Sequence, residues 1–443
     1  MSRIAKLCLL VFSLMTLGSG TAFAQTPATI TLAVENVPSA EGQVMASLCD
    51  NPAARIPGPC HTYSASAPAQ AGTTMLVFTG VRPGTYALQV FHDRNGNGLF
   101  DFPKEGYAFG NDAPFPPSFA AASITVLGHT AIHVHLVGMF SGGAGVQGSS
   151  GVTAPQGITK TDLRTGGLYG ELYMPAHIAP LPLIIAIGGS EGGLDTISAL
   201  CVSLTQNGYA VLALAYWKEP GLPQSLEGIP LEYFDRAIAW AGKQQDIAPG
   251  RIGMIGWSRG AEAALLVASR NPDMHAVVAV SPSAYVWQGL HFGGAGPMQP
   301  AWTVAGVPLP SIVPADLRPD HPMAQMFREK LDEAARRPDT AIAVEKINGP
   351  ILLLTGSDDA LWPSNLMSDR IVARLRARHF THAVEHRNYE GAGHAIFVGD
   401  PATVGPLDDS IMNGFLGGTA QANSHARQGS WRLVLKFLAK ALG

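Results

Sequence analysis

Hydrophobic and polar residues alternate in short runs over the first part of the chain. Four such runs lie at 29–34, 74–78, 85–90 and 131–136, and turn-forming residues separate them. An alternation with a period of two places one face of a strand in the core and the other in solvent. Residues 25–138 are therefore predicted to form a small antiparallel β-sandwich.

From about residue 158 the pattern changes, and apolar runs of strand length alternate with helical patterns. Residues 158–174 resemble a β-hairpin. The predicted strands that follow are 183–187, 210–215, 252–255, 276–280, 351–354 and 383–388, and the predicted helices are 196–206, 231–243, 365–378 and 430–441. Strands that alternate with helices indicate an α/β domain over 158–443, with a doubly wound, mostly parallel sheet covered on both faces.

Two segments interrupt these patterns. Residues 139–157 are rich in Gly and Ser and are predicted to be a flexible linker between the two domains. Residues from about 282 to 346 are rich in Gly, Pro and aromatic residues and contain one charged helix around 324–336. An insertion at this point is expected to lie over the carboxyl ends of the strands, where ligands bind in open α/β sheets.

The first 24 residues have the composition of a signal peptide. Arg3 and Lys6 precede an apolar stretch at 7–17, and Ala22-Phe23-Ala24 forms a small-x-small cleavage site. We therefore expect an exported protein, periplasmic or secreted. No later segment has about 18 uninterrupted apolar residues, so no transmembrane segment is expected. The formal net charge of −4 disfavours nucleic acid as a partner, and nothing in the sequence indicates an oligomeric state.

The motif Gly256-Trp257-Ser258-Arg259-Gly260 lies between a strand-like run and a strong helix-forming run. Strand, sharp turn and helix form the context of a nucleophile elbow, in which the turn exposes a serine hydroxyl. The dipole of the following helix lies beneath the oxyanion that forms there. Ser258 is therefore the predicted nucleophile. The alternative is a Gly-rich turn without a catalytic role, in a chain that contains 50 glycines.

An α/β-hydrolase carries an acid and then a histidine after the serine in chain order. Asp358 and Asp359 follow a predicted strand, and the spacing from Gly356 favours Asp359; a helix-capping role is the alternative. His394 lies on a Gly-rich turn after a late strand. We predict that His394 takes the serine proton while Asp359 fixes its tautomer.

The oxyanion hole needs two backbone amides. One is predicted to be Arg259, directly after the nucleophile, and the other Ser190 or Glu191 in the Gly-rich loop at 188–193. The alternative for this loop is a plain strand-to-helix turn. The loop does not match G-x-G-x-x-G, and the chain contains no G-K-[ST], so no nucleotide or other cofactor is expected.

Three further features concern cysteines and metals. Cys49 and Cys60 flank a Pro-rich loop and are predicted to form a disulfide in an oxidising compartment, two free thiols being the alternative. Cys201 lies in an apolar helical run and is expected to be buried. Asp93, Asn95 and Asn97 match part of a calcium-binding loop, but Lys104 occupies the position of an expected acidic ligand. Calcium binding is therefore only weakly indicated, and the alternative is an Asn/Gly-rich turn. No Cys/His spacing indicates zinc.

Residues 158–443 resemble the C-terminal catalytic domain of the acyl-CoA thioesterase and bile acid-CoA:amino acid N-acyltransferase family. The matching segments are 256–262, 344–350, 356–362, 391–394 and 430–431. Dienelactone-hydrolase-like enzymes are similar too. The family uses serine in thioesterases and cysteine in acyltransferases, so the resemblance implies hydrolysis for Ser258.

The N-terminal part resembles a different family. Residues 28–138 resemble a β-rich, DUF2141-like domain of unknown function from exported bacterial proteins, through the segments 92–98 and 103–109. Members of the thioesterase family usually carry an unrelated domain in this position.

The interpretation that accommodates these features is an exported serine hydrolase that cleaves a small acyl ester or thioester through an acyl-enzyme. One alternative is an acyltransferase that passes the acyl group to an amine or alcohol. The other is a binding protein with a degenerate hydrolase domain. Aromatic residues of the insertion are expected to form an apolar roof over Ser258, unless the insertion only packs on the core. They are Tyr285, Trp287, Phe292, Trp302 and Phe327.

Overall fold

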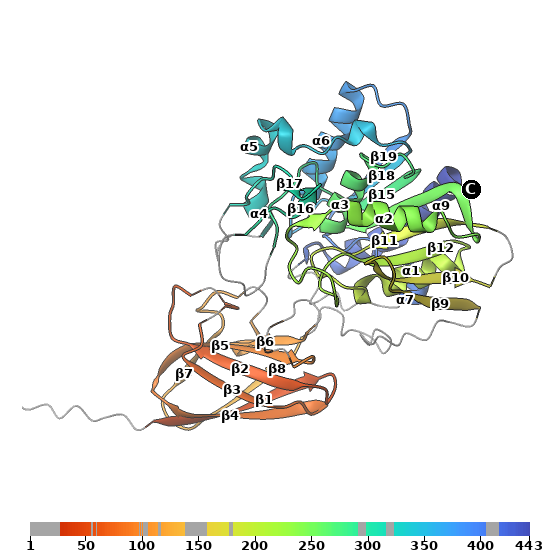
Figure 1. Ribbon diagram of the computed structural model, residues 1–443. Helices are drawn as coiled ribbons and strands as arrows, with labels where there is room; N and C mark the ends of the chain where they lie inside the picture. Colours follow the sequence, from red (N-terminus) through yellow and green to blue (C-terminus); the bar gives the residue numbers. More distant parts are fainter. Residues whose placement is uncertain are drawn as a thin grey trace, which may run out of the picture.

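The computed structural model describes residues 27–54, 56–58, 60–96, 98, 100, 105–113, 117–137, 157–176, 180–290, 298–315, 323–404 and 416–443. The predicted signal peptide and all but the last residue of the predicted linker lie outside these residues. A smaller β-rich domain and a larger α/β domain follow one another along the chain (Figure 1).

Two sheets form the smaller domain. Strands β4, β1 and β8 make one, and β3, β2, β5 and β6 make the other, with β7 paired to β5. Their bounds are β1 Ala28–Val37, β2 Gln43–Cys49, β3 Tyr63–Pro68, β4 Gly72–Val81, β5 Gly84–Asp93, β6 Tyr107–Phe109, β7 Ser123–Val126 and β8 Thr130–His135. Alternate residues of β1, such as Ile30, Leu32 and Val34, are fully buried between the sheets.

One pairing departs from the predicted antiparallel arrangement, because β1 and β8 run parallel. Parallel neighbours need a long crossover connection. Here the strands of the second sheet supply that connection, since they occupy most of the chain between β1 and β8. The other strand pairs described in this domain are antiparallel.

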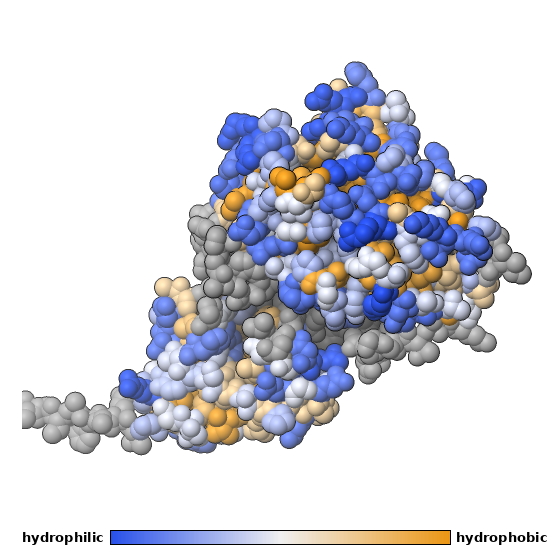
Figure 2. All heavy atoms as spheres, in the orientation of Figure 1, coloured by the Kyte–Doolittle hydropathy of each residue, from blue (hydrophilic) through white to orange (hydrophobic). Residues whose placement is uncertain are grey.

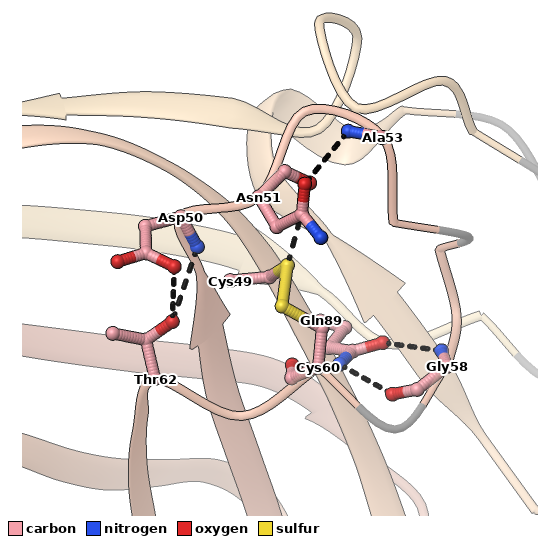
Figure 3. The surroundings of a disulfide bond; sticks show 8 residues. All are labelled: Cys49, Asp50, Asn51, Ala53, Gly58, Cys60, Thr62 and Gln89. Carbon is pink, nitrogen blue, oxygen red and sulfur yellow. Dashed lines mark hydrogen bonds between the residues drawn. A yellow bond between two sulfur atoms is a disulfide. The ribbon is translucent and has the colours of Figure 1, made fainter.

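The predicted disulfide between Cys49 and Cys60 is present and joins the end of β2 to the loop before β3. Figure 3 shows the hydrogen bonds around it. Gln89 on β5 accepts from Gly58 N at 3.0 Å and donates to Gly58 O at 3.0 Å. Thr62 donates to the Asp50 carboxylate at 2.8 Å, so the loop is held to the sheet on both sides of the disulfide.

An eight-stranded sheet forms the centre of the larger domain, in the order β19-β18-β15-β14-β11-β12-β10-β9. Strand β10 is antiparallel to both of its neighbours, β9 and β12, and the strands from β12 to β19 in this order run parallel to one another. The bounds are β9 Ile158–Leu163, β10 Tyr169–Pro175, β11 Leu181–Ile187, β12 Ala210–Ala215, β14 Ile247–Trp257, β15 Ala276–Val280, β18 Ile351–Gly356 and β19 Val384–Tyr389.

Helices cover both faces of this sheet, as the alternation of patterns predicted. The helices are α1 Ser198–Gln206, α2 Glu232–Ala241, α3 Arg259–Ala268, α4 Met323–Arg328, α5 Leu331–Ala335, α6 Ser364–Ala377, α7 Pro401–Val404 and α9 Ala420–Leu442. Leu183, Ile185 and Ile187 of β11 pack with residues of α2, α3 and α6. Ile184 and Ala186 point to the other face and pack with α1 and α9. This alternation within one fully apolar strand is what burial on both faces requires.

Two helices differ from their predicted extents. Helix α9 begins at Ala420 rather than 430, with Thr419 accepting from Ala422 N as its N-cap. Gly429 lies inside this helix. A Cβ at this position would be only 3.0 Å from the Tyr389 ring, so close packing against Tyr389 explains why a glycine occurs within the helix. The charged helix predicted around 324–336 is divided into α4 and α5 by a tight turn from Lys330 N to Phe327 O.

The insertion is attached to α3 by a buried ion pair. Arg259 and Glu262 lie 2.8 Å apart, with side chains 4% and 0% exposed. Arg259 donates to the carbonyls of Trp287 and Gln288, at 3.2 and 3.1 Å. Glu262 accepts from Trp302 Nε1 at 2.7 Å and from Trp287 N at 3.2 Å.

Trp302 begins β16 (Trp302–Val304), which pairs with β13 (Ile229–Pro230) and β17 (Val307–Pro308) in a small separate sheet. One buried pair therefore connects the helix after the elbow to two segments of the insertion.

Hydrophilic side chains predominate on the face of the larger domain seen in Figure 2, with hydrophobic ones scattered among them. The largest exposed apolar side chains of the smaller domain are Met75, Val77 and Leu127. None of the helices in the described ranges is long and apolar enough to cross a membrane.

Removal of the disulfide should destabilise the smaller domain. The two cysteines are 11 residues apart, and a loop of this size corresponds to about 2–3 kcal/mol in a chain-entropy account. Denaturant unfolding of Cys49→Ser/Cys60→Ser against the wild type measures this loss. Peptide mapping of the wild-type protein without reduction, after production in an oxidising compartment, should recover the Cys49–Cys60 peptide pair, and two free thiols would contradict the prediction.

Glu262→Ala should lower the stability of the larger domain strongly, because it leaves the Arg259 guanidinium buried without its partner. Breaking a buried pair in this way costs about 3–5 kcal/mol. Calorimetry should show the loss in the transition of the larger domain. Glu333→Ala, which breaks an exposed pair with Lys330, is the matched control and should change little. Equal effects of the two substitutions would contradict the importance of the buried pair.

Candidate active site

Ser258 lies in the turn between β14 and α3, with φ 57° and ψ −120°. A positive φ is strained for a residue with a side chain and persists only where the surroundings impose it. A Cβ on Gly256 would lie 2.2 Å from Gly260 O, and a Cβ on Gly260 would lie 2.1 Å from Gly188 O. Both glycines of the motif are therefore required by close backbone contacts, and the turn places Ser258 at the carboxyl end of β14.

Asp359 follows β18, and its carboxylate accepts hydrogen bonds from its own loop. Leu361 N and Trp362 N donate to Oδ1 at 3.0 and 3.2 Å, and Ser364 Oγ donates to Oδ2 at 2.6 Å. The Asp359 side chain is 1% exposed. Asp358 is exposed and accepts from Ser357 Oγ instead. Of the two candidate aspartates, Asp359 is the one that contacts His394.

His394 Nδ1 lies 2.9 Å from both carboxylate oxygens of Asp359. Because a carboxylate accepts hydrogen bonds, this contact assigns the imidazole proton to Nδ1 and leaves Nε2 as the basic nitrogen. Nε2 is buried and has no hydrogen-bond partner among the residues that the structure describes. The described residues therefore contain no hydrogen bond between Ser258 Oγ and His394 Nε2, and in serine hydrolases this bond is often long before substrate binds.

The backbone of His394 is held from three directions. Its amide donates to Leu416 O at 2.8 Å. Its carbonyl accepts from Ser281 Oγ at 2.9 Å and from Trp257 Nε1 at 3.3 Å. Ser281 follows β15 and Trp257 ends β14, so neighbouring strands of the sheet position the imidazole.

A chain of aromatic rings leads from His394 into the insertion. The Trp257 and Trp362 rings lie 5.5 and 6.4 Å from the imidazole, measured between ring centres. Phe327 contacts Trp362 at 5.7 Å, and Trp287 contacts Phe327 at 4.9 Å. Of the aromatic residues predicted to form a roof, Phe327 thus reaches a ring that contacts the histidine.

The other predicted roof residues have different surroundings. Trp302 packs against Tyr216 and Phe234 in the core, with ring centres 5.7 and 6.4 Å away. Tyr285 is nearly buried and accepts from Arg370 Nη1 at 3.0 Å. Phe292 lies outside the described residues. The insertion therefore packs on the core with much of its aromatic surface, which was the alternative interpretation of its sequence.

The loop at 188–193 is anchored by the residues that follow β12. Tyr216 donates to Gly188 O at 2.9 Å, and Trp217 Nε1 donates to Gly189 O at 3.2 Å. Burial raises the pKa of Tyr216 well above its usual value, so its hydroxyl keeps the proton it donates. The N–H and C=O of one peptide unit point in opposite directions. The Ser190 amide, which shares a peptide unit with Gly189 O, therefore points away from Trp217.

The three candidate oxyanion donors differ in what their amides contact. The amides of Ser190 and Arg259 donate to no other residue in the described ranges. Burial raises the pKa of the Glu191 carboxyl, and the interaction of the Glu191 amide with that carboxylate partly lowers it. A Cβ on Gly189 would lie 3.0 Å from Ser258 Cβ, so the loop closely approaches the serine. This geometry leaves Ser190 and Arg259 as the available pair.

Several residues of this site carry no recognisable signal in the sequence. Ser281 and Tyr216 contact the base and the loop only because the fold brings their strands together, whereas Ser364 and Trp362 contact the candidate acid from its own loop. For Ser364 and Trp362, a position within five residues of the candidate acid is the one available hint.

The weak calcium candidate lies in the smaller domain. Asp93 is buried, and its Oδ2 accepts from Gln43 Nε2 and Gly98 N, both at 3.0 Å. Asn97 lies outside the described residues. Among the residues that are described, no group of three or more His, Cys, Asp or Glu side chains could hold a metal ion.

Two known families match separate parts of the chain. Residues 229–443 match the family described as "BAAT / Acyl-CoA thioester hydrolase C terminal". Residues 32–134 match a family described as an uncharacterised protein conserved in bacteria, DUF2141.

Relatives of known name cover the larger domain. The peroxisomal succinyl-coenzyme A thioesterase of Mus musculus is 30% identical over 299 residues, which are 65% of this chain and 66% of that protein. The acyl-coenzyme A amino acid N-acyltransferase 2 of Rattus norvegicus is 30% identical over 310 residues, which are 65% of this chain and 67% of the rat protein. This chain thus spans about two thirds of the length of these relatives.

Among solved structures, an α/β hydrolase enzyme from a Medee basin deep-sea metagenome library has 15% sequence identity and a TM-score of 0.40. The match covers 65% of this chain and 99% of that structure. On the strength of its sequence relatives, the chain belongs to the acyl-CoA thioester hydrolase and bile acid-CoA:amino acid N-acyltransferase family through its C-terminal domain.

Proposed function

We propose that this protein is an exported serine hydrolase that cleaves an ester or thioester through an acyl-enzyme intermediate. The observation that carries the proposal is the buried Asp359–His394 pair, whose Nε2 has no partner among the described residues and whose imidazole lies against Trp257, the residue before Ser258. The family contains thioesterases and acyltransferases, both of which form acyl-enzymes by this chemistry.

In the proposed mechanism, His394 Nε2 removes the proton of Ser258 Oγ as the oxygen attacks the acyl carbonyl. Asp359 holds the imidazole by Nδ1 and stabilises the imidazolium. The amides of Ser190 and Arg259 stabilise the oxyanion of the tetrahedral intermediate. His394 then protonates the leaving alcohol or thiol, and the same steps with water release the acid.

Export and an oxidising location are part of the proposal. The basic, apolar and small-x-small segments before Gln25 support secretion through a cleaved signal peptide. The Cys49–Cys60 disulfide supports an oxidising compartment, because disulfides are rare in the reducing cytosol.

An acyltransferase is the second candidate, because a rat relative of that name matches as large a share of this chain as the thioesterase does. The family resemblance assigns cysteine to the acyltransferases, which favours hydrolysis for a chain with Ser258. Product analysis with and without amine or alcohol acceptors separates the two activities.

Substitution of the proposed triad should abolish most of the activity. Ser258→Ala and His394→Ala are each expected to lower kcat by about 10³-fold or more, and Asp359→Ala somewhat less. The losses should not add in double variants, because the three groups act as one unit. An ester chain-length panel provides the measurement, and Asp358→Ala is the matched control. A greater loss for Asp358→Ala than for Asp359→Ala would refute this choice of acid.

A simple acyl ester should have a higher kcat/KM than the acyl-CoA of equal acyl length. Residues 283–316 contain no Lys or Arg, so this part of the insertion offers no cation to a CoA diphosphate. Each added methylene should contribute up to about 0.8 kcal/mol until the apolar site is full. Steady-state kinetics on matched pairs tests this, and a clear preference for the CoA thioester would contradict it.

A further inference from the structure

A second carboxyl group, that of Glu191, is buried beside the nucleophile and is not used in the proposed mechanism. The Glu191 residue is 5% exposed. Burial raises the pKa of Glu191, and hydrogen bonds from two backbone amides and Thr196 partly counteract that effect. The charge of His394 also lowers the pKa of this carboxyl.

The Glu191 carboxyl is bonded to the loop on which it lies. Its Oε1 accepts from Gly189 N at 2.7 Å and from Thr196 Oγ1 at 2.8 Å. Thr196 belongs to the 3₁₀ turn Asp195–Ile197 that leads into α1. Oε1 therefore ties the beginning of the loop to its end.

Two glycines provide the space for this contact. A Cβ on Gly188 would lie 2.5 Å from Glu191 Oε1. A Cβ on Gly189 would lie 2.9 Å from Glu191 Oε2 and 3.0 Å from Ser258 Cβ. The carboxyl and the nucleophile are thus packed against the same glycine.

The peptide unit between Gly188 and Gly189 is held at both ends. Tyr216 donates to its carbonyl, and its N–H donates to Glu191 Oε1 on the opposite side. The orientation of this peptide limits that of the next one, between Gly189 and Ser190. Trp217 donates to the carbonyl of that second peptide, and its N–H is the Ser190 amide.

We propose that the Glu191 side chain is a positioning residue that orients the Ser190 amide toward the oxyanion, by accepting hydrogen bonds at Oε1. The inference rests on the proposed hydrolysis, and it assigns a role to the side chain rather than to the backbone of Glu191. Because the oxyanion exists only in the transition state and intermediate, loss of this orientation lowers kcat and leaves KM nearly unchanged.

Three variants test the role. Glu191→Ala removes the acceptor and should lower kcat by about 10²-fold, which is the effect of losing one oxyanion donor. Glu191→Gln keeps an acceptor at Oε1 and should stay within about tenfold of the wild type. Thr196→Val keeps the Glu191 carboxyl, removes one of its two donors and should cause a smaller loss of kcat. Glu385→Ala, which removes an exposed carboxylate on β19, is the matched control and should behave as the wild type.

Two readouts distinguish this inference from the proposed function. The first is kcat and KM on the best ester of the panel, and the second is the rate at which a fluorophosphonate labels Ser258, which also needs the oxyanion hole but no identified substrate. A wild type that is neither labelled nor active refutes the proposed function together with this inference.

With an active or labelled wild type, Glu191 alone is tested. Wild-type kcat and labelling rate in Glu191→Ala, or a loss confined to KM, refute the positioning role. Equal damage in Glu191→Gln and Glu191→Ala also refutes it, provided that circular dichroism and the melting temperature show both variants folded. If Glu191→Ala does not fold, Glu191→Gln and Thr196→Val still decide, because the proposal requires a nearly active Gln variant and a kcat loss in the Val variant.

Discussion

Close backbone packing around Ser258 is the constraint on which the rest of the site depends. Three segments meet there: the end of β14, the start of α3 and the loop after β11. Their backbones approach so closely that Gly256, Gly260 and Gly189 have no room for a Cβ without displacing a neighbour. This packing holds Ser258 at a positive φ and brings the candidate oxyanion loop beside it.

Buried polar groups secure the parts that backbone packing alone leaves free to move. Asp359 is surrounded by donors from its own loop, so its carboxylate has one orientation in which it reaches His394. Arg259 and Glu262 use the first turn of α3 to hold the insertion. Arg259 thus contributes both a candidate oxyanion amide and a buried guanidinium. This couples the position of the insertion to the geometry of the elbow. In a low-dielectric interior such groups specify a geometry, since any other arrangement leaves one of them unpaired.

Elements were predicted correctly where their sequence signals depend only on neighbouring residues. The strands at 210–215 and 276–280 have the predicted bounds, because uninterrupted apolar runs flanked by turns depend on nearby residues alone. Helix α9 begins ten residues before its predicted start, and Gly429 inside it packs against the Tyr389 ring, a contact that the local sequence does not show. The parallel pairing of β1 with β8 was missed for the same reason, since register between strands about a hundred residues apart depends on the whole domain.

The sequence by itself determined the β-rich class of the N-terminal part, the α/β class of the part that follows, and the chain order of the candidate serine, acid and histidine. Each of these depends on local periodicity or on spacing within a short motif. Only the tertiary structure decided that Asp359 rather than Asp358 contacts His394, that Trp302 packs in the core, and that the Ser190 amide points away from Trp217. These outcomes depend on which way a side chain or a peptide unit points, and that direction is set by residues such as Tyr216, Trp217 and Ser281, which come from other strands and meet only in the folded chain.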